Sequence, residues 1–333
     1  MNRLRVGVIG AGAWGKNHVR TVGTLADAEL AAVCDADAKT RERVSRQFPK
    51  ALVTGDVAEL LGAVDAVIIA SPAKTHAALA LRAIEAGKPC LVEKPFALAT
   101  KDAEAVARLA AERQVPVVAG HLLVFHPALE RLRALLQAGE LGDVYYLYGL
   151  RVNLGQVRAD ENALWSFGPH DVSVALFLLG EAPVRVAAHG HCYLQKGVED
   201  VVFLTMEFAS GVLAHVQLSW LDPHKERKVT VVGSKKMVTF DDMEPREKLR
   251  IYDKGVNRPE YASYGESLAV REGDIFIPKI PNVEPLNAEL SHFVRVARGQ
   301  EAPRASADDG VRVVRVLEAA SRSLVAGGTP VTL

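Results

Sequence analysis

Three glycines form the first candidate binding element of the sequence. Gly10, Gly12 and Gly15 follow the apolar run 6–9 in the order Gly-x-Gly-x-x-Gly and precede a segment with helical spacing. Gly10 permits a tight turn, Gly12 lets a ligand approach the backbone, and Gly15 allows close packing of the helix on the strand. The N–H groups at the start of that helix attract an anion such as a pyrophosphate. Two neighbours in the same turn are assigned to this site, Ala13 and Trp14.

Asp35 stands at the end of the next expected strand, 30–34, and 25 residues beyond Gly10. A carboxylate at this place can accept hydrogen bonds from the ribose hydroxyls of an adenosine and would repel a 2′-phosphate. No arginine follows Asp35 directly, so the spacing favours NAD over NADP as the cofactor. The spacing alone leaves one alternative open, a glycine turn in another α/β protein with Asp35 as a solvated strand end.

Polar residues also lie at the ends of two later expected strands, 66–70 and 90–92. Ligands of open parallel sheets bind beyond the carboxyl ends of the strands, so these residues are candidates for the same site. They are Ser71, Pro72, Thr75, His76, Glu93 and Lys94. Each pattern also has a purely structural explanation, because a serine before proline is typical of a helix start and a lysine before proline is typical of a turn.

Strands alternate with helices over the first third of the chain. The expected strands are 6–9, 30–34, 66–70, 90–92 and 115–119, and the expected helices are 15–25, 38–48, 75–86 and 100–113. This alternation predicts right-handed βαβ units and a doubly wound parallel sheet, an α/β fold. The remainder predicts a second set of strands. These are 144–152, 184–191, 201–208, 212–220, 228–232, 236–240 and 249–252, with helices at 171–179 and 286–298.

The composition favours a two-domain protein that binds a small molecule. The chain has 333 residues, and its 40 basic and 40 acidic side chains leave no net charge to attract nucleic acid or a membrane surface. Three distant cysteines fit a reduced compartment, and no apolar run reaches the roughly 18 residues that span a bilayer. We therefore expect a cytoplasmic protein. His189 and His191 share a strand face without a cluster of further ligands, so no metal site is expected.

These motifs together resemble the Gfo/Idh/MocA oxidoreductases. Two later elements extend the resemblance over the whole chain, Gly120-His121 and Gly168-Pro169-His170-Asp171. The resemblance implies an NAD-binding Rossmann domain over 1–121. It implies a substrate and oligomerisation domain over 122–333, built on an open, mostly antiparallel sheet, with C-terminal helices that pack back on both domains.

The expected strand 144–152 carries apolar or aromatic side chains in both of its alternating sets, Leu147 in one and Tyr146 and Tyr148 in the other. A sheet that is wet on one face would alternate cleanly between apolar and polar residues. We therefore expect both faces to be covered, one by helices and the other by a second subunit. This predicts a homodimer or homotetramer formed through the C-terminal sheet.

Hydride transfer from a carbinol to nicotinamide requires a base for the hydroxyl proton. The resemblance places Lys94 and His170 beside the reacting hydroxyl as a catalytic pair, and Trp165 beside the cofactor. Next to cationic NAD⁺ and partly desolvated, the ammonium form of Lys94 is disfavoured, and a histidine has an ordinary pKa near 6.5. Many family members have an aspartate four residues before this histidine, where this sequence has Ser166, so a relay of three groups is not carried over.

Three stretches of the sequence, 12–18, 162–171 and 219–227, resemble a nucleotide-sugar branch of the family. That branch includes UDP-N-acetylglucosaminuronate 3-dehydrogenases of surface-polysaccharide biosynthesis. The resemblance predicts oxidation of that sugar to its 3-keto form. Expected substrate contacts are Lys94, Arg158, Asn162, Ser166, His170, Lys225 and Arg227, with the cations meeting the diphosphate and carboxylate. Two alternatives stay open. One is a keto-sugar reductase or polyol dehydrogenase of the same family, and the other is a non-catalytic NAD(H)-binding sensor.

Overall fold

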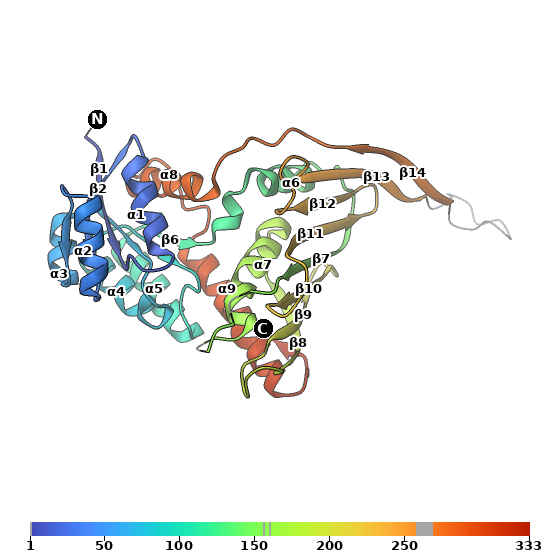
Figure 1. The fold of residues 1–333 in the computed structure, drawn as a ribbon. Coiled ribbons are helices and arrows are strands. Elements are labelled where there is room, and N and C mark those ends of the chain that lie inside the picture. The colour runs from blue at the N-terminus through green and yellow to red at the C-terminus, as the bar shows by residue number, and fades with distance from the viewer. Residues whose placement is uncertain (1, 156, 160, 258–268) are drawn as a thin grey trace. The chain divides into compact units, whose positions relative to one another are not determined.

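The computed structural model describes residues 2–155, 157–159, 161–257 and 269–333 (Figure 1). These residues form two compact units. Unit 1 runs to Phe125 and takes in Val283–Arg315, while unit 2 comprises His126–Asn282 and Val316–Leu333. The segment 283–315, which the sequence assigned to the second domain, thus belongs to the first unit.

Unit 1 is a six-stranded parallel sheet in the order β3-β2-β1-β4-β5-β6, which confirms the predicted Rossmann arrangement. Its strands are β1 (Leu4–Ile9), β2 (Ala28–Cys34), β3 (Leu52–Thr54), β4 (Ala66–Ile69), β5 (Cys90–Glu93) and β6 (Val117–Gly120). Its helices are α1 (Gly15–Thr24), α2 (Ala38–Gln47), α3 (Val57–Ala63), η1 (Ala73–Thr75), α4 (His76–Glu85), α5 (Thr100–Arg113), η2 (Leu122–Phe125) and α8 (Pro285–Ala297).

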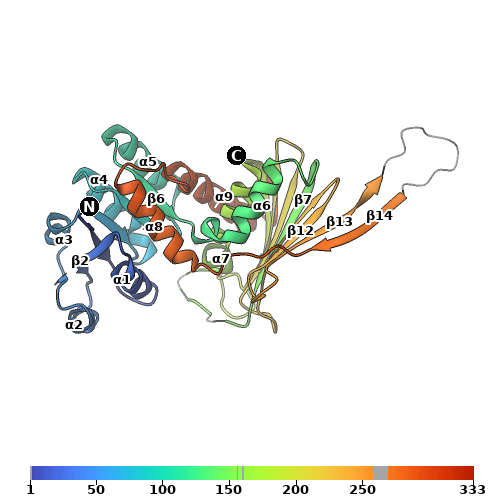
Figure 2. The ribbon, with the colours of Figure 1, turned by 90° about the horizontal axis from the view of Figure 1, so that it is seen from above.

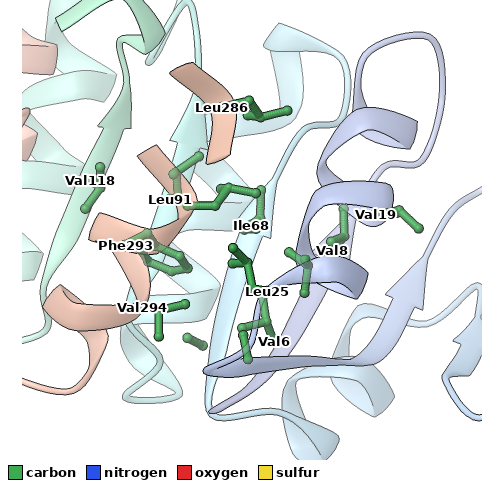
Figure 3. Close-up of a cluster of buried hydrophobic side chains, with 14 of the residues drawn as sticks. Val6, Val8, Val19, Leu25, Ile68, Leu91, Val118, Leu286, Phe293 and Val294 are labelled. Carbon is green, nitrogen blue, oxygen red and sulfur yellow. The ribbon is translucent and has the colours of Figure 1, made fainter. Parts of the chain in front are cut away.

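Helix α8 completes the core of unit 1 although it comes from the far end of the chain. Its residues Leu286, Phe293 and Val294 lie among side chains of α1 and of the central strands (Figure 3). Burial of one such large apolar side chain contributes about 1.5–3 kcal/mol, so α8 is an integral part of the unit. Its sequence shows the required spacing, because Leu286, Leu290 and Phe293 repeat at helical intervals on one face.

Unit 2 is built on a nine-stranded sheet in the order β14-β13-β12-β11-β7-β10-β9-β8-β15. Strands β7 and β10 are parallel, and the other neighbouring pairs are antiparallel. The strands are β7 (Val144–Val152), β8 (Pro183–His191), β9 (Val201–Phe208), β10 (Leu213–Ser219), β11 (Glu226–Gly233), β12 (Met237–Asp241), β13 (Leu249–Asn257), β14 (Ala269–Phe276) and β15 (Val331–Thr332).

Helices cover one face of this sheet. They include α6 (Pro127–Gln137) and α7 (Ala163–Leu179), which contact β12 and the β7–β10 region respectively (Figure 2). The residues that point to this face, such as Leu147, Ala214 and Val231, are fully or almost fully buried. Helix α9 (Ala307–Val325) contributes residues to both units.

Helix α7 begins eight residues earlier than the sequence predicted, at Ala163 rather than at 171. The side chain of Asn162 caps its N-terminus by accepting a hydrogen bond from the backbone N–H of Trp165 at 3.1 Å. Pro169 lies inside the helix, where its missing N–H leaves one helical hydrogen bond unmade. The helix continues through this proline and includes the residues 163–170 that the predicted helix 171–179 left out.

In the described part of the chain no helix is both long and apolar enough to cross a membrane.

Candidate active site

The glycine turn of unit 1 has the geometry that its spacing predicts. Gly10 has a φ of +87°, and a Cβ there would lie 2.6 Å from the backbone of Ser71. A Cβ on Gly15 would lie 1.9 Å from the carbonyl oxygen of Gly10, so both positions exclude a side chain. A Cβ on Gly12 would meet no protein atom within 4 Å. Gly12 therefore faces open space, which fits the approach of a pyrophosphate to the start of α1.

Asp35 lies directly against this turn. Its Oδ2 accepts a hydrogen bond from the backbone N–H of Ala11 at 2.7 Å, and its Oδ1 accepts one from the N–H of Asp37 at 2.9 Å. Each carboxylate oxygen can accept further hydrogen bonds, so the group is oriented by the backbone and still free to receive the two ribose hydroxyls. Arg43 donates to the carbonyl of Ala11 at 2.6 Å and holds the turn from the other side.

The polar residues after β4 are joined to one another. The Oγ of Ser71 and the Oγ1 of Thr75 are 2.7 Å apart, and Thr75 donates to the carbonyl of Pro72. The ring of His76 lies 2.8 Å from the carbonyl oxygens of both Ser71 and Pro95. Because both ring nitrogens of His76 face backbone carbonyls, this buried histidine links the ends of β4 and β5 and has no nitrogen left for a ligand.

Glu93, at the end of β5, is the most connected side chain of the site. Its Oε1 accepts from the indole Nε1 of Trp14 at 2.6 Å and lies 2.7 Å from Nε2 of His18, while Oε2 accepts from the backbone N–H of Lys94 at 3.0 Å. Burial by itself would raise the pKa of Glu93, but the bonds from His18 and Trp14 outweigh it and lower the pKa. The carboxylate is therefore ionised and holds the glycine turn to the segment that carries Lys94.

His121 follows β6 and is buried close to Glu93. Burial lowers its pKa to about 4, against the opposing effect of the nearby carboxylates of Asp309 and Glu93. The ring is consequently neutral at physiological pH.

In unit 2 the predicted residues Trp165, Ser166 and His170 all lie on helix α7. Trp165 donates from its indole nitrogen to the Oγ of Ser321 at 3.0 Å, and Ser166 is buried. His170 is half-buried, and the next residue, Asp171, forms a buried bidentate ion pair with Arg151 of β7 at 2.5 Å and 3.3 Å. This pair fixes the orientation of α7 on the sheet and so the side on which His170 is presented.

The other predicted substrate contacts already have partners within unit 2 or are exposed. Asn162 caps α7 and also donates to Glu199 at 2.6 Å. Arg158 pairs with Glu161 at 2.9 Å, and Arg227 lies 3.7 Å from Asp242. Lys225 is exposed. The expected function of these three cations in binding a substrate carboxylate stays a prediction.

Two buried residues near Glu93 were not singled out from the sequence, His18 of α1 and Glu289 of α8. His18 follows the glycine turn by three residues and is completely buried. Glu289 interrupts the apolar face of α8 between Leu286 and Leu290, and a charged residue on such a face was the signal that could have identified it. No group of three or more potential metal ligands was found among the described residues.

Family comparisons match both parts of the chain. Residues 4–121 match the oxidoreductase family with an NAD-binding Rossmann fold, GFO_IDH_MocA. Residues 129–239 match the GFO/IDH/MocA C-terminal domain.

Individual relatives include sugar and inositol dehydrogenases. UDP-N-acetylglucosamine 3-dehydrogenase of Acidithiobacillus ferrooxidans is 31% identical over 98% of both chains, and its solved structure superposes with a TM-score of 0.85, covering 98% of this chain and 99% of that one. Inositol 2-dehydrogenase 1 of Saccharopolyspora erythraea is 35% identical over 65% of this chain and 67% of its own. GenD2 of gentamicin A biosynthesis, solved in complex with NAD, is 28% identical with a TM-score of 0.82 over 100% and 97% of the two chains.

The position of Asp35 predicts how the cofactor is selected. We expect Asp35→Ala to weaken NADH binding roughly tenfold, the effect of losing about one charge-assisted hydrogen bond, and to weaken NADPH binding much less. Asp37→Ala is the matched control, because Asp37 is an exposed carboxylate two residues away that caps α2. Titration calorimetry with both cofactors measures the effect. Equal affinity of the unmodified protein for NADH and NADPH would rule out this function of Asp35.

Proposed function

Because this chain belongs to the Gfo/Idh/MocA family of NAD-dependent oxidoreductases, and is thus a dehydrogenase acting on the CH–OH group of a sugar, we propose that it oxidises a nucleotide sugar. The specific substrate that we propose is a UDP-linked N-acetylglucosamine-type sugar, oxidised at C3. The observation that carries this proposal is the similarity to UDP-N-acetylglucosamine 3-dehydrogenase over nearly the full length of both chains.

In the proposed reaction the protein removes the proton of the substrate hydroxyl while a hydride leaves the carbinol carbon. When bound, NAD⁺ accepts the hydride from the carbinol carbon, which becomes a ketone. Lys94 Nζ, in its neutral form, takes the hydroxyl proton, and the family resemblance assigns His170 as its partner in this proton transfer. Support for Lys94 comes from its place directly after β5, in the segment that Glu93 joins to the glycine turn.

Substitution of Lys94 tests this mechanism. We expect Lys94→Ala to lower turnover by at least about 10²-fold, the usual effect of a positioned acid or base, and to leave NADH affinity nearly unchanged. Lys74→Ala is the control, because Lys74 is an exposed lysine after the neighbouring strand β4. If Lys94 and His170 act as a pair, the double substitution lowers turnover little more than the worse single one. Near-normal turnover of Lys94→Ala would remove this lysine from the mechanism.

Whether the substrate is a neutral sugar or a uronate depends on whether a cationic side chain is available to pair with the uronate carboxylate. The sequence predicted UDP-N-acetylglucosaminuronate, whose carboxylate would need a cation. Arg158 and Arg227 each have a carboxylate partner already, and the near-full-length relative is named for the neutral sugar. Both observations favour UDP-N-acetylglucosamine. The inositol dehydrogenases among the relatives make a free polyol the second candidate.

A substrate panel distinguishes these candidates. We expect kcat/KM for UDP-N-acetylglucosamine to exceed that for the uronate by about tenfold or more, because an unpaired substrate carboxylate costs roughly 1–3 kcal/mol on binding. NADH formation is followed for both sugars and for myo-inositol, and NMR locates the new ketone. A preference for the uronate that is lost in Arg158→Gln would restore the prediction from the sequence. Oxidation of myo-inositol alone would show instead that the substrate is a free polyol.

We also propose that the protein assembles through the second face of the unit 2 sheet. Tyr146 and Tyr148 of β7 stack on one another there and remain 44% and 41% exposed, and the neighbouring Phe203 and Leu213 are 40% and 48% exposed. In the cross-strand register Tyr146 lies opposite Leu213 and Tyr148 opposite His215, whose ring stacks on Phe203, so these side chains form an exposed, largely aromatic strip. A strip of this kind is typical of a subunit interface.

Light scattering tests this assembly. We expect the protein to be a dimer or tetramer at micromolar concentration, and Leu213→Glu to shift it toward the monomer because a charge would be buried in the interface. Val325→Glu is the control, because Val325 is 92% exposed and lies on α9, outside the sheet. A monomeric unmodified protein would contradict the proposal.

A further inference from the structure

Six buried side-chain atoms of unit 1 have no hydrogen-bond partner among the described residues, and five of them belong to residues that interact with Glu93. They are Nδ1 of His18, Oγ1 of Thr21, both ring nitrogens of His121 and both carboxyl oxygens of Glu289. Buried polar atoms in native proteins are nearly always paired with protein or with ordered water, so a group of them in one place requires an explanation. Glu289 is the most demanding member, because its carboxyl group is completely buried.

The unpaired atoms come from helix α1, from helix α8 and from His121, which follows β6. His18 and Thr21 lie one turn apart on the buried side of α1. Glu289 lies on the face of α8 that packs against α1 and η2. The charge of Glu93 acts on Glu289 strongly enough to raise the pKa of the latter, an effect second only to burial.

The hydrogen bond between Glu93 and His18 determines which ring nitrogen of His18 carries a hydrogen. An ionised carboxylate only accepts, so the contact between His18 Nε2 and Glu93 requires the hydrogen to be on Nε2. In a neutral imidazole the other nitrogen, Nδ1, is then an acceptor that needs a donor. A protonated carboxylic acid is such a donor, and burial beside Glu93 raises the pKa of Glu289 well above the ordinary value.

We propose that Glu289 is a positioning residue for the cofactor turn, which donates a hydrogen bond through buried water shared with Thr21 to Nδ1 of His18. His18 in turn donates to Glu93, and Glu93 holds Trp14 and the backbone of Lys94. The chain of donors thus runs from α8, near the end of the sequence, to the glycine turn near its start.

Loss of the Glu289 proton would weaken the binding of NADH. The charged group that acts on Glu289 is Glu93, at the end of β5. Glu93 is in turn influenced by His18 of α1 and by Lys94, and together with Asp309 it acts on His121, which follows β6. On α8 itself the buried His292 follows Glu289 by one turn. Because burial and the charge of Glu93 raise the pKa of Glu289, its carboxyl group keeps the proton above the ordinary range of a glutamate and loses it as the pH rises through the raised pKa. Two carboxylates would then be buried together beside the site for an anionic pyrophosphate, so NADH binding weakens on the alkaline side.

The test is a set of NADH titrations by fluorescence between pH 6 and pH 10. We expect the Kd of the unmodified protein to be flat at neutral pH and to rise by up to about tenfold per pH unit above the transition, as the loss of one proton requires. Glu289→Gln keeps a donor and cannot ionise, so it should match the unmodified protein at neutral pH and lose the alkaline rise. Glu289→Leu has no donor and should bind roughly tenfold more weakly at every pH.

Two controls separate Glu289 from its surroundings. Glu284→Gln makes the same change on an exposed glutamate at the start of α8, paired with Arg20, and should leave the alkaline rise unchanged. Lys94→Met removes the ionisable lysine next to Glu93, and the rise should persist there. An unchanged rise in Glu289→Gln, its loss in Lys94→Met, or normal affinity of Glu289→Leu would overturn the proposal.

Infrared spectroscopy gives a second measurement that needs no stable variant. The unmodified protein should show the carbonyl stretch of a protonated carboxylic acid, shifted in D₂O and lost over the same pH range in which NADH binding weakens. No such band, or a band that survives in Glu289→Gln, would contradict the assignment. Neither measurement uses the sugar, so a wrong substrate proposal leaves this one intact, and the reverse holds as well.

Discussion

The carboxylate of Glu93 joins segments that are far apart in the sequence. It accepts hydrogen bonds from Trp14 and His18, which belong to the first βα connection, and from the backbone of Lys94, its own neighbour. A buried charge is tolerated only when it is paired and hydrogen-bonded, so these contacts must form together for unit 1 to be stable. The same contacts set the distance between the turn that receives the pyrophosphate and the lysine assigned to the proton.

A second buried charge pair has the corresponding function in unit 2. Arg151 of β7 and Asp171 of α7 meet in bidentate geometry under the helix. Removal of one member of such a pair typically costs about 3–5 kcal/mol, because the other charge is left buried without compensation. The rotation of α7 on the sheet is therefore fixed, and with it the direction of His170, the residue next to Asp171.

The family and the type of reaction are better supported than the substrate, because the relatives include dehydrogenases of both a nucleotide sugar and inositol. The functions proposed for the glycine turn, Asp35 and Lys94 concern the cofactor and the proton, and they are compatible with sugars and polyols alike. Arg158 and Arg227, which the sequence predicted to bind the sugar, each have a carboxylate partner in unit 2. A fold-level likeness accordingly supports hydride chemistry on a CH–OH group more strongly than it supports any one sugar.

The sequence by itself determined the Rossmann sheet, the cofactor and most strands of unit 2, because these depend on local periodicity and on glycines at fixed spacing. Strand β7 falls at the predicted 144–152, and the turn at Gly10 has the positive φ that its position requires. Contacts between distant residues were decided only by the tertiary structure. Local signals placed the start of α7 at 171, but the cap at Asn162 extends it back to Ala163. The surroundings of Glu289, and hence its proton, depend on packing between α8 and α1, more than 260 residues apart, which no local pattern records.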